Sequence, residues 1–243
     1  RQLALPGYSE EVQKRLSESH VGIVGIGGLG SPASMYLAAG GVGQMTLIDG
    51  DAVELINLHR QIIHNPEMLD VAKVESAREF IEILNPEVEL NCVPEKLDKN
   101  NAAKYLAECD LILDCSDNFK TRFFIDDTCH ELLLPVVYGA VTGWHGQVTV
   151  FLHSDDPEEK NGNVKRLRDL FAEEPEEGSV PKSDVAGILG PFAGMLGSMM
   201  AVEAMKIAGG LESKLAEKLI SIDGRTMRSE EHTSELQSHA PIS

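Results

Sequence analysis

Short apolar runs alternate with amphipathic stretches along the first 140 or so residues of the chain. The apolar runs predict strands at Val21–Val24, Gln44–Ile48, Val88–Cys92, Leu111–Asp114 and Val136–Gly139. The amphipathic stretches predict helices at Pro32–Ala39, Ala72–Leu84, Asn101–Glu108 and Asn118–Leu132. Regular alternation of strand and helix is typical of a parallel sheet with crossover helices on its faces. We therefore expect an α/β fold with a Rossmann-like, doubly wound, mostly parallel sheet.

The pattern changes after the fifth predicted strand. Gly146–Leu152 alternates between apolar and polar residues, which predicts an added antiparallel strand. A polar stretch from Ser154 to Asp184 predicts a long crossover loop. Leu189–Ala208 then predicts an apolar helix, and Leu219–Asp223 a last strand. Since neither an internal repeat nor a linker interrupts the pattern, we expect one domain over residues 1–227.

The last segment, Arg228–Ser243, has no apolar periodicity and no turn signals. Its letters, RSEEHTSELQSHAPIS, resemble the translation of a sequencing-adapter oligonucleotide. We therefore interpret residues 228–243 as a non-native tail and leave them out of the fold prediction.

Composition narrows the classes of partner and compartment. A net charge of -18 over 243 residues argues against nucleic acid or an anionic membrane as the main partner. No apolar run is long enough to span a membrane and no signal-like segment opens the chain, so a cytoplasmic location is expected. The four cysteines form no C-x-x-C pair, which favours buried thiols in a reducing compartment over zinc ligation.

A glycine-rich turn follows the first predicted strand. Gly25, Gly27, Gly28 and Gly30 give the G-x-G-x-x-G spacing, which brings backbone N–H groups close to an anion at a helix N-terminus. Asp49 stands where a dinucleotide enzyme places its ribose-binding acid. The turn alone leaves three alternatives open: a structural turn, an NAD site of a dehydrogenase, or a site for ATP or another nucleotide.

Polar residues beyond the turn favour ATP chemistry. They follow predicted strand ends or begin a predicted helix, and they are Asp51, Asn57, Arg60, Lys73, Asp117 and Asn118. Arg and Lys would neutralise charge on the α-phosphate and the departing pyrophosphate, and Asp would hold Mg²⁺. A dehydrogenase has no general need for this set, although each residue alone could be a solvated side chain or a helix cap.

Five segments together resemble the ThiF/MoeB/HesA family, bacterial relatives of ubiquitin-activating enzymes. The segments are GIGGLGSP, LIDGDAVELINLHRQIIH, AKVESAREFIEILNP, LILDCSDNFKTRFFID and GILGPFAGMLGSMMAVEAMKIAGG. The resemblance implies an ATP-dependent adenylyltransferase that acts on the C-terminal Gly-Gly carboxylate of a ubiquitin-like sulfur carrier protein. It also implies Mg²⁺ as cofactor and a homodimer.

The resemblance also implies roles for individual residues. Gly28 would lie against the phosphates and Asp49 would bind the ribose hydroxyls, while Asp117 would bind Mg²⁺ and Asn118 would line the pocket. Asn57, Arg60 and Lys73 would contact the triphosphate, and Arg1 would reach the site of the other subunit. The predicted catalytic residues are Arg60, Lys73, Asp117 and Arg1. The predicted nucleotide-binding residues are Gly25, Gly27, Gly28, Gly30, Asp49, Asp51, Asn57, Arg60, Lys73, Asp117 and Asn118.

Two departures from the family pattern limit what is expected. Many relatives bind zinc through two C-x-x-C pairs; the region of the first pair holds no cysteine here, so no zinc is predicted. Some relatives carry a cysteine in the crossover loop where this chain has Ser183 or a neighbour, so a sulfur relay through an enzyme cysteine is not expected. Thiamine thiazole synthesis is the favoured pathway. Molybdopterin synthesis and a non-catalytic carrier-docking module stay as alternatives.

Overall fold

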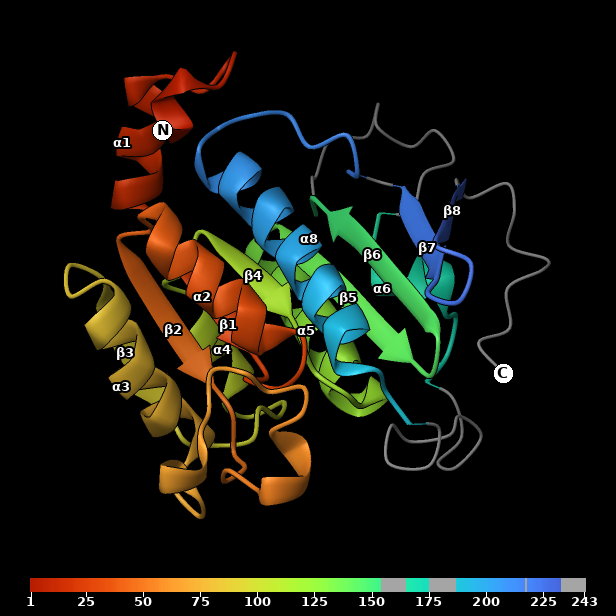
Figure 1. The fold of residues 1–243 in the computed structure, drawn as a ribbon. Helices are drawn as coiled ribbons and strands as arrows, with labels where there is room; N and C mark the ends of the chain where they lie inside the picture. Colours follow the sequence, from red (N-terminus) through yellow and green to blue (C-terminus); the bar gives the residue numbers. More distant parts are fainter. Residues whose placement is uncertain (154–164, 175–186, 217, 233–243) are drawn as a thin grey trace.

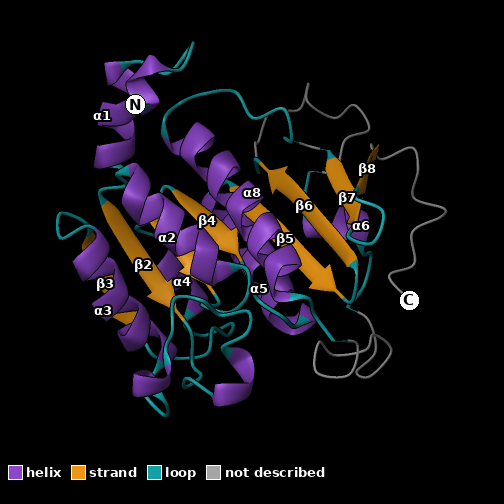
Figure 2. Ribbon diagram, in the orientation of Figure 1, coloured by secondary structure: helices purple, strands orange, loops and turns teal. Residues whose placement is uncertain are grey.

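The computed structural model describes residues 1–153, 165–174, 187–216 and 218–232. Its centre is one eight-stranded sheet in the order β3-β2-β1-β4-β5-β6-β7-β8 (Figures 1 and 2). The first five strands along this order are parallel, and β6, β7 and β8 continue the sheet antiparallel. The strands are β1 (His20–Val24), β2 (Gln44–Ile48), β3 (Glu89–Val93), β4 (Leu111–Asp114), β5 (Val136–Thr142), β6 (His145–Phe151), β7 (Leu219–Asp223) and β8 (Arg228–His232).

Helices cover both faces of this sheet. The α-helices are α1 (Glu10–Glu18), α2 (Gly30–Gly40), α3 (Lys73–Leu84), α4 (Ala102–Leu106), α5 (Phe119–Leu132), α6 (Leu167–Leu170) and α8 (Gly190–Ala208). Short 3₁₀ turns are η1 (Gln2–Ala4), η2 (Leu55–Asn57) and η3 (Pro66–Met68). Side chains of α2, α3 and α8 join one hydrophobic cluster, and those of α4, α5 and α6 join the other. The doubly wound α/β fold expected from the sequence is therefore confirmed.

Alternation along the central strands explains why the sheet is buried on both sides. In β4, Leu111 and Leu113 belong to the cluster under α2 and α8, whereas Ile112 belongs to the cluster under α5. All three side chains are inaccessible to solvent. Successive side chains of a strand point to opposite faces, so a continuous apolar run is what a strand covered by helices on both faces requires.

The predicted strands and helices are present, with ends that shift by a few residues at most. Helix α1 was not predicted from the pattern. Ser9 caps it by accepting a hydrogen bond from the Val12 N–H, and only Val12 and Leu16 are buried. Val12 and Leu16 are four residues apart and lie on one face, while most of this helix faces solvent.

The exclusion of the C-terminal tail from the fold is wrong for residues 228–232. These residues form β8, which pairs with β7 from Asp223 opposite Arg228 to Leu219 opposite His232. Met227 forms the turn with a positive φ of 56°. An edge strand is held by backbone hydrogen bonds, so it needs no apolar period. The non-native origin of residues 228–243 stays a prediction.

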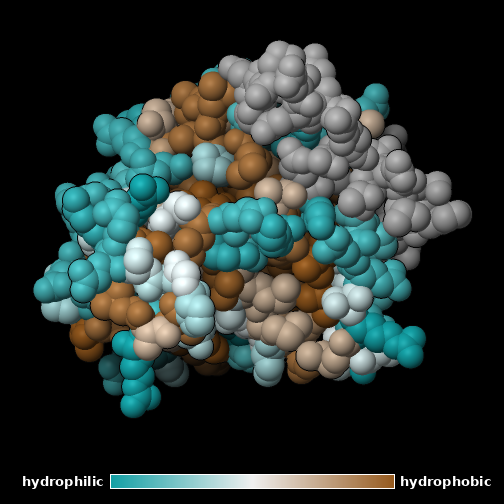
Figure 3. All heavy atoms as spheres, turned by 90° about the horizontal axis from the view of Figure 1, so that it is seen from above, coloured by the Kyte–Doolittle hydropathy of each residue, from teal (hydrophilic) through white to brown (hydrophobic). Residues whose placement is uncertain are grey.

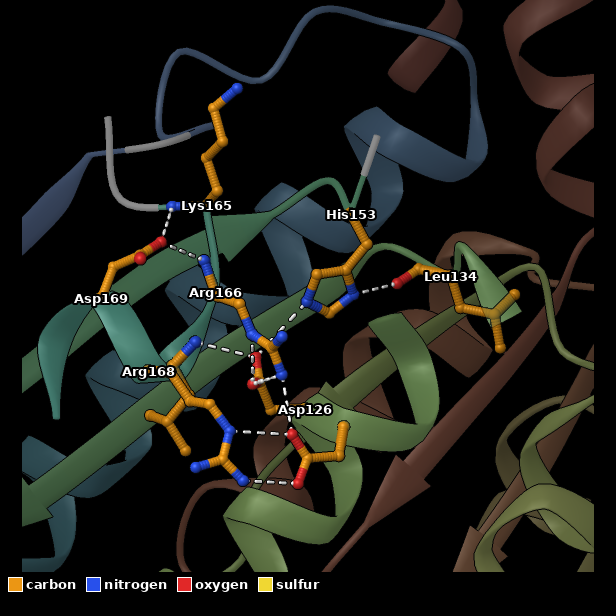
Figure 4. Close-up of polar contacts among 9 residues, drawn as sticks. Asp126, Leu134, His153, Lys165, Arg166, Arg168 and Asp169 are labelled. Carbon is orange, nitrogen blue, oxygen red and sulfur yellow. Dashed lines mark hydrogen bonds and ion pairs between the residues drawn. The ribbon is translucent and has the colours of Figure 1, made fainter. Parts of the chain in front are cut away.

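In the described part of the expected crossover loop, the chain forms the short helix α6, which is held to α5 by ion pairs and hydrogen bonds. Arg166 donates to Asp126 at 2.9 Å and to Asp127 at 2.7 Å, and the Leu167 N–H donates to Asp126 at 2.8 Å (Figure 4). His153 Nε2 lies 3.4 Å from Asp126 Oδ1. The prediction of a loop throughout Ser154–Asp184 is thus wrong at Leu167–Leu170.

Within the described residues, no helix combines the length and the apolarity needed to cross a membrane. Figure 3 shows the end of the sheet at which the parallel strands begin, where hydrophobic and hydrophilic areas interleave. The loops that carry the predicted site residues gather at the other end, at the bottom of Figure 1.

Candidate nucleotide site

The predicted site residues come from loops at the carboxyl ends of β1, β2 and β4. In an open α/β sheet, ligands bind at this edge, near the point where the strand order reverses. Here β1 lies between β2 and β4, so its glycine-rich turn is at that point. The first residues of α8 border the site. Ala193 lies next to the glycine-rich turn, and Gly190 lies against the backbone of His59.

Two glycines of the turn are required by the fold itself. Gly25 has a φ of +92°, and a Cβ there would lie 2.7 Å from the Cys115 carbonyl oxygen. A Cβ on Gly30 would lie 1.9 Å from the Gly25 carbonyl oxygen. Both positions need glycine with or without a ligand.

The other two glycines are not required by the fold. A Cβ on Gly27 would meet only the Gln61 amide, at 3.5 Å. A Cβ on Gly28 would lie 3.3 Å from the Ala193 Cβ and 3.6 Å from Arg60, which calls for a shift of a few tenths of an ångström. Because Gly27 and Gly28 have no side chains, a ligand can approach the backbone there. This space suits a phosphate group.

The amides of this turn are open. Among the described residues, no acceptor pairs with the N–H groups of Gly27, Gly28 or Leu29, which precede α2. Unpaired N–H groups together with the helix dipole make such a terminus attractive to an anion. This is the property that binding a nucleotide phosphate demands.

Asp49 holds the turn in place. Its carboxylate accepts hydrogen bonds from the Ile26 N–H at 2.8 Å and from the Asp51 N–H at 2.9 Å. Burial raises the pKa of Asp49, and the nearby Lys73 opposes that rise. Lys73 Nζ lies 3.9 Å from Asp49 and 3.3 Å from Asp51. The structure thus brings Asp49, Asp51 and Lys73 together, as the sequence predicts.

Sequence reasoning missed one basic residue of this group. Lys96 follows β3, and its Nζ lies 3.2 Å from Asp51 Oδ1. Its position just past a strand end was a signal of the same kind that selected Asp49 and Asp51. Lys96 is 79% exposed, so its ion pair with Asp51 is open to rearrangement by a ligand.

Arg60 is a cation without an acidic partner. No ion pair or side-chain hydrogen bond to its guanidinium is found among the described residues, and its methylenes lie beside Gly28. The adjacent Gln61 is 4% exposed, and its Oε1 is buried without a hydrogen-bond partner in the described structure. Asn57, in the same loop, donates to Glu54 at 3.3 Å. Arg60 therefore keeps its full charge available beside the open amides.

Asp117 and Asn118 have different surroundings. Asn118 caps α5, since its Oδ1 accepts a hydrogen bond from the Thr121 N–H at 2.9 Å; the capping alternative is confirmed for this residue. Asp117 is exposed, and its carboxylate accepts a hydrogen bond from the Asn118 amide at 3.4 Å. Beneath them, Arg122 donates to the Ser116 carbonyl at 2.7 Å and fixes the loop.

The residues present suit Mg²⁺ held partly by a nucleotide. The described residues contain no cluster of three or more His, Cys, Asp or Glu side chains that would hold a metal by itself. Mg²⁺ is usually bound through one or two carboxylates together with phosphates and water. Asp117, exposed at the edge next to the glycine-rich turn, fits the role of that carboxylate.

Arg1 lies apart from this group. Gln2 donates to the Gly40 carbonyl at 3.3 Å, so the N-terminus sits at the far end of α2. The glycine-rich turn is at the other end of this helix, roughly 16 Å away at 1.5 Å of rise per residue. Ser183 lies outside the described residues.

The thiols are not prepared for nucleophilic attack. Three of the four cysteines are buried and Cys92 is partly buried. Burial raises the pKa of Cys109 to about 12 and also raises those of Cys92, Cys115 and Cys129. Thiols with raised pKa values are inert, so the prediction of buried, structural cysteines is confirmed for Cys109, Cys115 and Cys129.

Comparison with known proteins names the family. The model of the ThiF family matches residues 1–241. The chain belongs to the ThiF family. The archaeal relative from Haloferax volcanii, named SAMP-activating enzyme E1, is 38% identical over 227 residues, which are 93% of this chain and 78% of the relative.

Other relatives are longer. The Drosophila sechellia protein named adenylyltransferase and sulfurtransferase MOCS3 is 39% identical over 224 residues, 92% of this chain and 48% of the relative. The chain thus spans about half the length of the MOCS3 relatives. Among solved structures, E. coli MccB with ATP matches with a TM-score of 0.78 at 20% identity, over 92% of this chain and 66% of that one. PaaA matches with a TM-score of 0.76 at 21% identity, over 94% and 68%. These matches establish the fold.

Proposed function

We propose that the chain is an ATP-dependent adenylyltransferase that activates the C-terminal Gly-Gly carboxylate of a ubiquitin-like sulfur carrier protein. The observation that carries the proposal is the open anion site, where three backbone N–H groups and the nearby Arg60 side chain have no hydrogen-bond or ion-pair partner among the described residues. The names of the MOCS3 and SAMP-activating relatives support the same activity.

The reaction joins the carrier's carboxylate to the α-phosphorus of ATP. A carboxylate oxygen forms a bond to the α-phosphorus, and the bond between the α-phosphorus and the oxygen that bridges the α- and β-phosphates breaks. The products are an acyl-adenylate and pyrophosphate, which takes the electron pair of the broken bond. No proton transfer and no enzyme nucleophile are required, so catalysis rests on positioning and charge neutralisation.

Each part of the site has a role in this step. The Gly27, Gly28 and Leu29 amides bind phosphate oxygens, and Arg60 and Lys73 neutralise the charge that grows on the leaving pyrophosphate. Asp49 orients the turn and faces the ribose, while Asn57 and Asn118 line the pocket. Mg²⁺, when bound, supplies positive charge that neutralises the phosphates, and Asp117 would hold the ion.

The site includes Arg1 of a second copy in this proposal. Arg1 lies at the far end of α2 from its own chain's glycine-rich turn, which leaves it free to serve a partner in a homodimer. Mixing an Arg1→Ala chain with a Lys73→Ala chain tests this, because one site of each mixed dimer would keep both residues. Partial recovery of activity is expected; verified mixed dimers without recovery would exclude the shared site.

The pathway is proposed as thiamine thiazole synthesis, with molybdopterin synthesis as the alternative. The test is ATP–pyrophosphate exchange with the sulfur carrier of each pathway, each offered intact and without its terminal Gly-Gly. Exchange that requires ATP, one intact carrier and its Gly-Gly end is expected. Absence of exchange with every intact carrier would reject the enzyme and favour a carrier-docking module.

A further inference from the structure

His64 occupies a buried position between the glycine-rich turn and α3. The side chain is 6% exposed, and both ring nitrogens have partners. Nε2 lies 3.1 Å from the Ile26 carbonyl oxygen, and Nδ1 lies 2.9 Å from Ser76 Oγ. The loop of residues 53–71 is thereby joined to the glycine-rich turn, 38 residues away in sequence, and to α3, which follows the loop.

The proton positions on His64 follow from its partners. A carbonyl oxygen only accepts, so Nε2 must carry the proton that it donates to Ile26. In the neutral ring Nδ1 then accepts the Ser76 hydroxyl proton. Burial lowers the pKa of His64, and the positive charge of Lys73 lowers it further, so the ring is neutral at neutral pH.

The hydrogen bond to Ile26 sets the direction of an amide of the nucleotide site. The Ile26 carbonyl and the Gly27 N–H belong to one peptide group, which is planar and trans. The two bonds of a trans peptide group point in opposite directions. When His64 holds the carbonyl on the protein side, the Gly27 N–H must point away from it, and that N–H has no partner in the described structure.

The hydrogen bond to Ser76 links this amide to the cation of the site. Ser76 is 2% exposed and lies on α3 three residues after Lys73, close to one helical turn. The backbone N–H of His64 also donates to the Gln61 carbonyl at 3.1 Å, in the turn that follows Arg60. The ring of His64 therefore contacts the glycine-rich turn and the helix of Lys73, and the backbone of His64 contacts the turn next to Arg60.

We propose that His64 is a positioning residue of the nucleotide site, which directs the Gly27 N–H toward the phosphates and fixes the distance from this amide to Lys73. The inference rests on the proposed function, since it assigns the phosphates of ATP to the glycine-rich turn. His64 itself touches no reacting atom. Its effect is carried by the Ile26–Gly27 peptide and by Ser76.

The experiment measures ATP binding calorimetrically with the full 243-residue chain and without a carrier, next to the thermal stability of each variant. His64→Phe keeps a ring and removes both hydrogen bonds, so its Kd for ATP is expected to rise about tenfold. Ser76→Ala removes one hydrogen bond and is expected to raise the Kd about threefold. His64→Gln keeps a donor for Ile26 and should recover most of the affinity.

A matched control separates positioning from stability. Ile81 lies on α3 and is fully buried, and Ile81→Ala opens a cavity without removing a hydrogen bond of His64. Its Kd for ATP should stay at the wild-type value although its melting temperature falls. The inference is overturned if His64→Phe binds ATP as the wild type does, if His64→Gln is as weak as His64→Phe, or if Ile81→Ala shows the same loss. A wild-type chain that binds no ATP would overturn the proposed function and this inference together.

Discussion

Charged side chains are concentrated in two regions of the molecule, the anchor of α6 and the nucleotide site. The two regions differ in how completely their polar groups are paired. In the anchor of α6, Asp126 is 2% exposed and accepts hydrogen bonds from the Leu167 N–H and from Arg166, with His153 close by. Arg168 donates to Asp127 with two nitrogens. Every charge there has a partner.

The nucleotide site leaves comparable groups without partners. The guanidinium of Arg60, three backbone N–H groups and Gln61 Oε1 lack partners among the described residues. Buried or half-buried polar groups without partners cost free energy unless a ligand satisfies them. The anchor pairs its charges throughout, whereas the nucleotide site combines the paired Asp49, Asp51 and Lys73 with polar groups that have no partner among the described residues. The predictions below test this distinction.

The largest effect is expected on stability, at the anchor. Asp126→Asn leaves Arg166 and the Leu167 N–H with a poorer acceptor in a buried place, and should lower the free energy of unfolding by about 3 kcal/mol. Urea unfolding measures the loss. Asp127→Asn is the control, because Asp127 is 42% exposed and its pairs should contribute less than about 1 kcal/mol.

Activity sharpens the same comparison. Pyrophosphate exchange per folded molecule should be unchanged in Asp126→Asn, since the anchor touches no ligand in the proposal. A large loss of exchange in well-folded Asp126→Asn would mean that the anchor takes part in the reaction, and the distinction would fail.

The next effect is on activity, at Arg60. Arg60→Ala should lower kcat/KM for ATP about 100-fold, because in the proposed reaction it removes a cation that would face the leaving pyrophosphate. Its free energy of unfolding should change by no more than about 0.5 kcal/mol, since no ion pair is lost. Exchange kinetics and urea unfolding of one preparation give both values. A stability loss as large as that of Asp126→Asn would show that Arg60 has structural partners.

The two kinds of glycine give a smaller, paired effect. Gly28→Ala places a methyl group where phosphate would approach, and should raise the KM for ATP about tenfold with little change in stability. Gly30→Ala forces a Cβ against the Gly25 carbonyl and should destabilise the fold by about 1–3 kcal/mol. Equal effects of both changes on stability would contradict the separation drawn between them.

The smallest effect is a pH dependence of the anchor. Burial raises the pKa of Asp126, but hydrogen bonds from His153 and Leu167 and the charge of Arg166 outweigh it and hold the pKa below 3.8. A lowered pKa adds stability above pH 3.8, which is lost as the pH falls through the folded-state value. The stability difference between wild type and Asp126→Asn should therefore shrink between pH 7 and about pH 3. A constant difference would contradict ionisation as its cause.

The sequence was sufficient for strands β1 to β7 and for the loops that carry the site. Strands β2, β4 and β7 have the predicted bounds, because each is an apolar run ended by Asp or Gly residues. The gathering of Asp49, Lys73 and the glycine-rich turn followed from the rule that carboxyl ends of parallel strands share one edge.

Other features depend on contacts that no local pattern records. His64 reaches Ile26 across 38 residues of sequence, and Arg166 reaches Asp126 across 40. The anchor and the role of His64 were missed for this reason. Strand β8 was missed because backbone pairing with β7 needs no apolar side chains.

One measurement tests the central claim most directly: the intact mass of a Gly-Gly sulfur carrier after incubation with the chain, ATP and Mg²⁺. Wild type should convert the carrier to its adenylate and release pyrophosphate, and Arg60→Ala should form far less in the same time. A carrier that stays unmodified under wild-type enzyme, or one that gains a phosphate while ADP accumulates, would contradict adenylyl transfer at the open anion site.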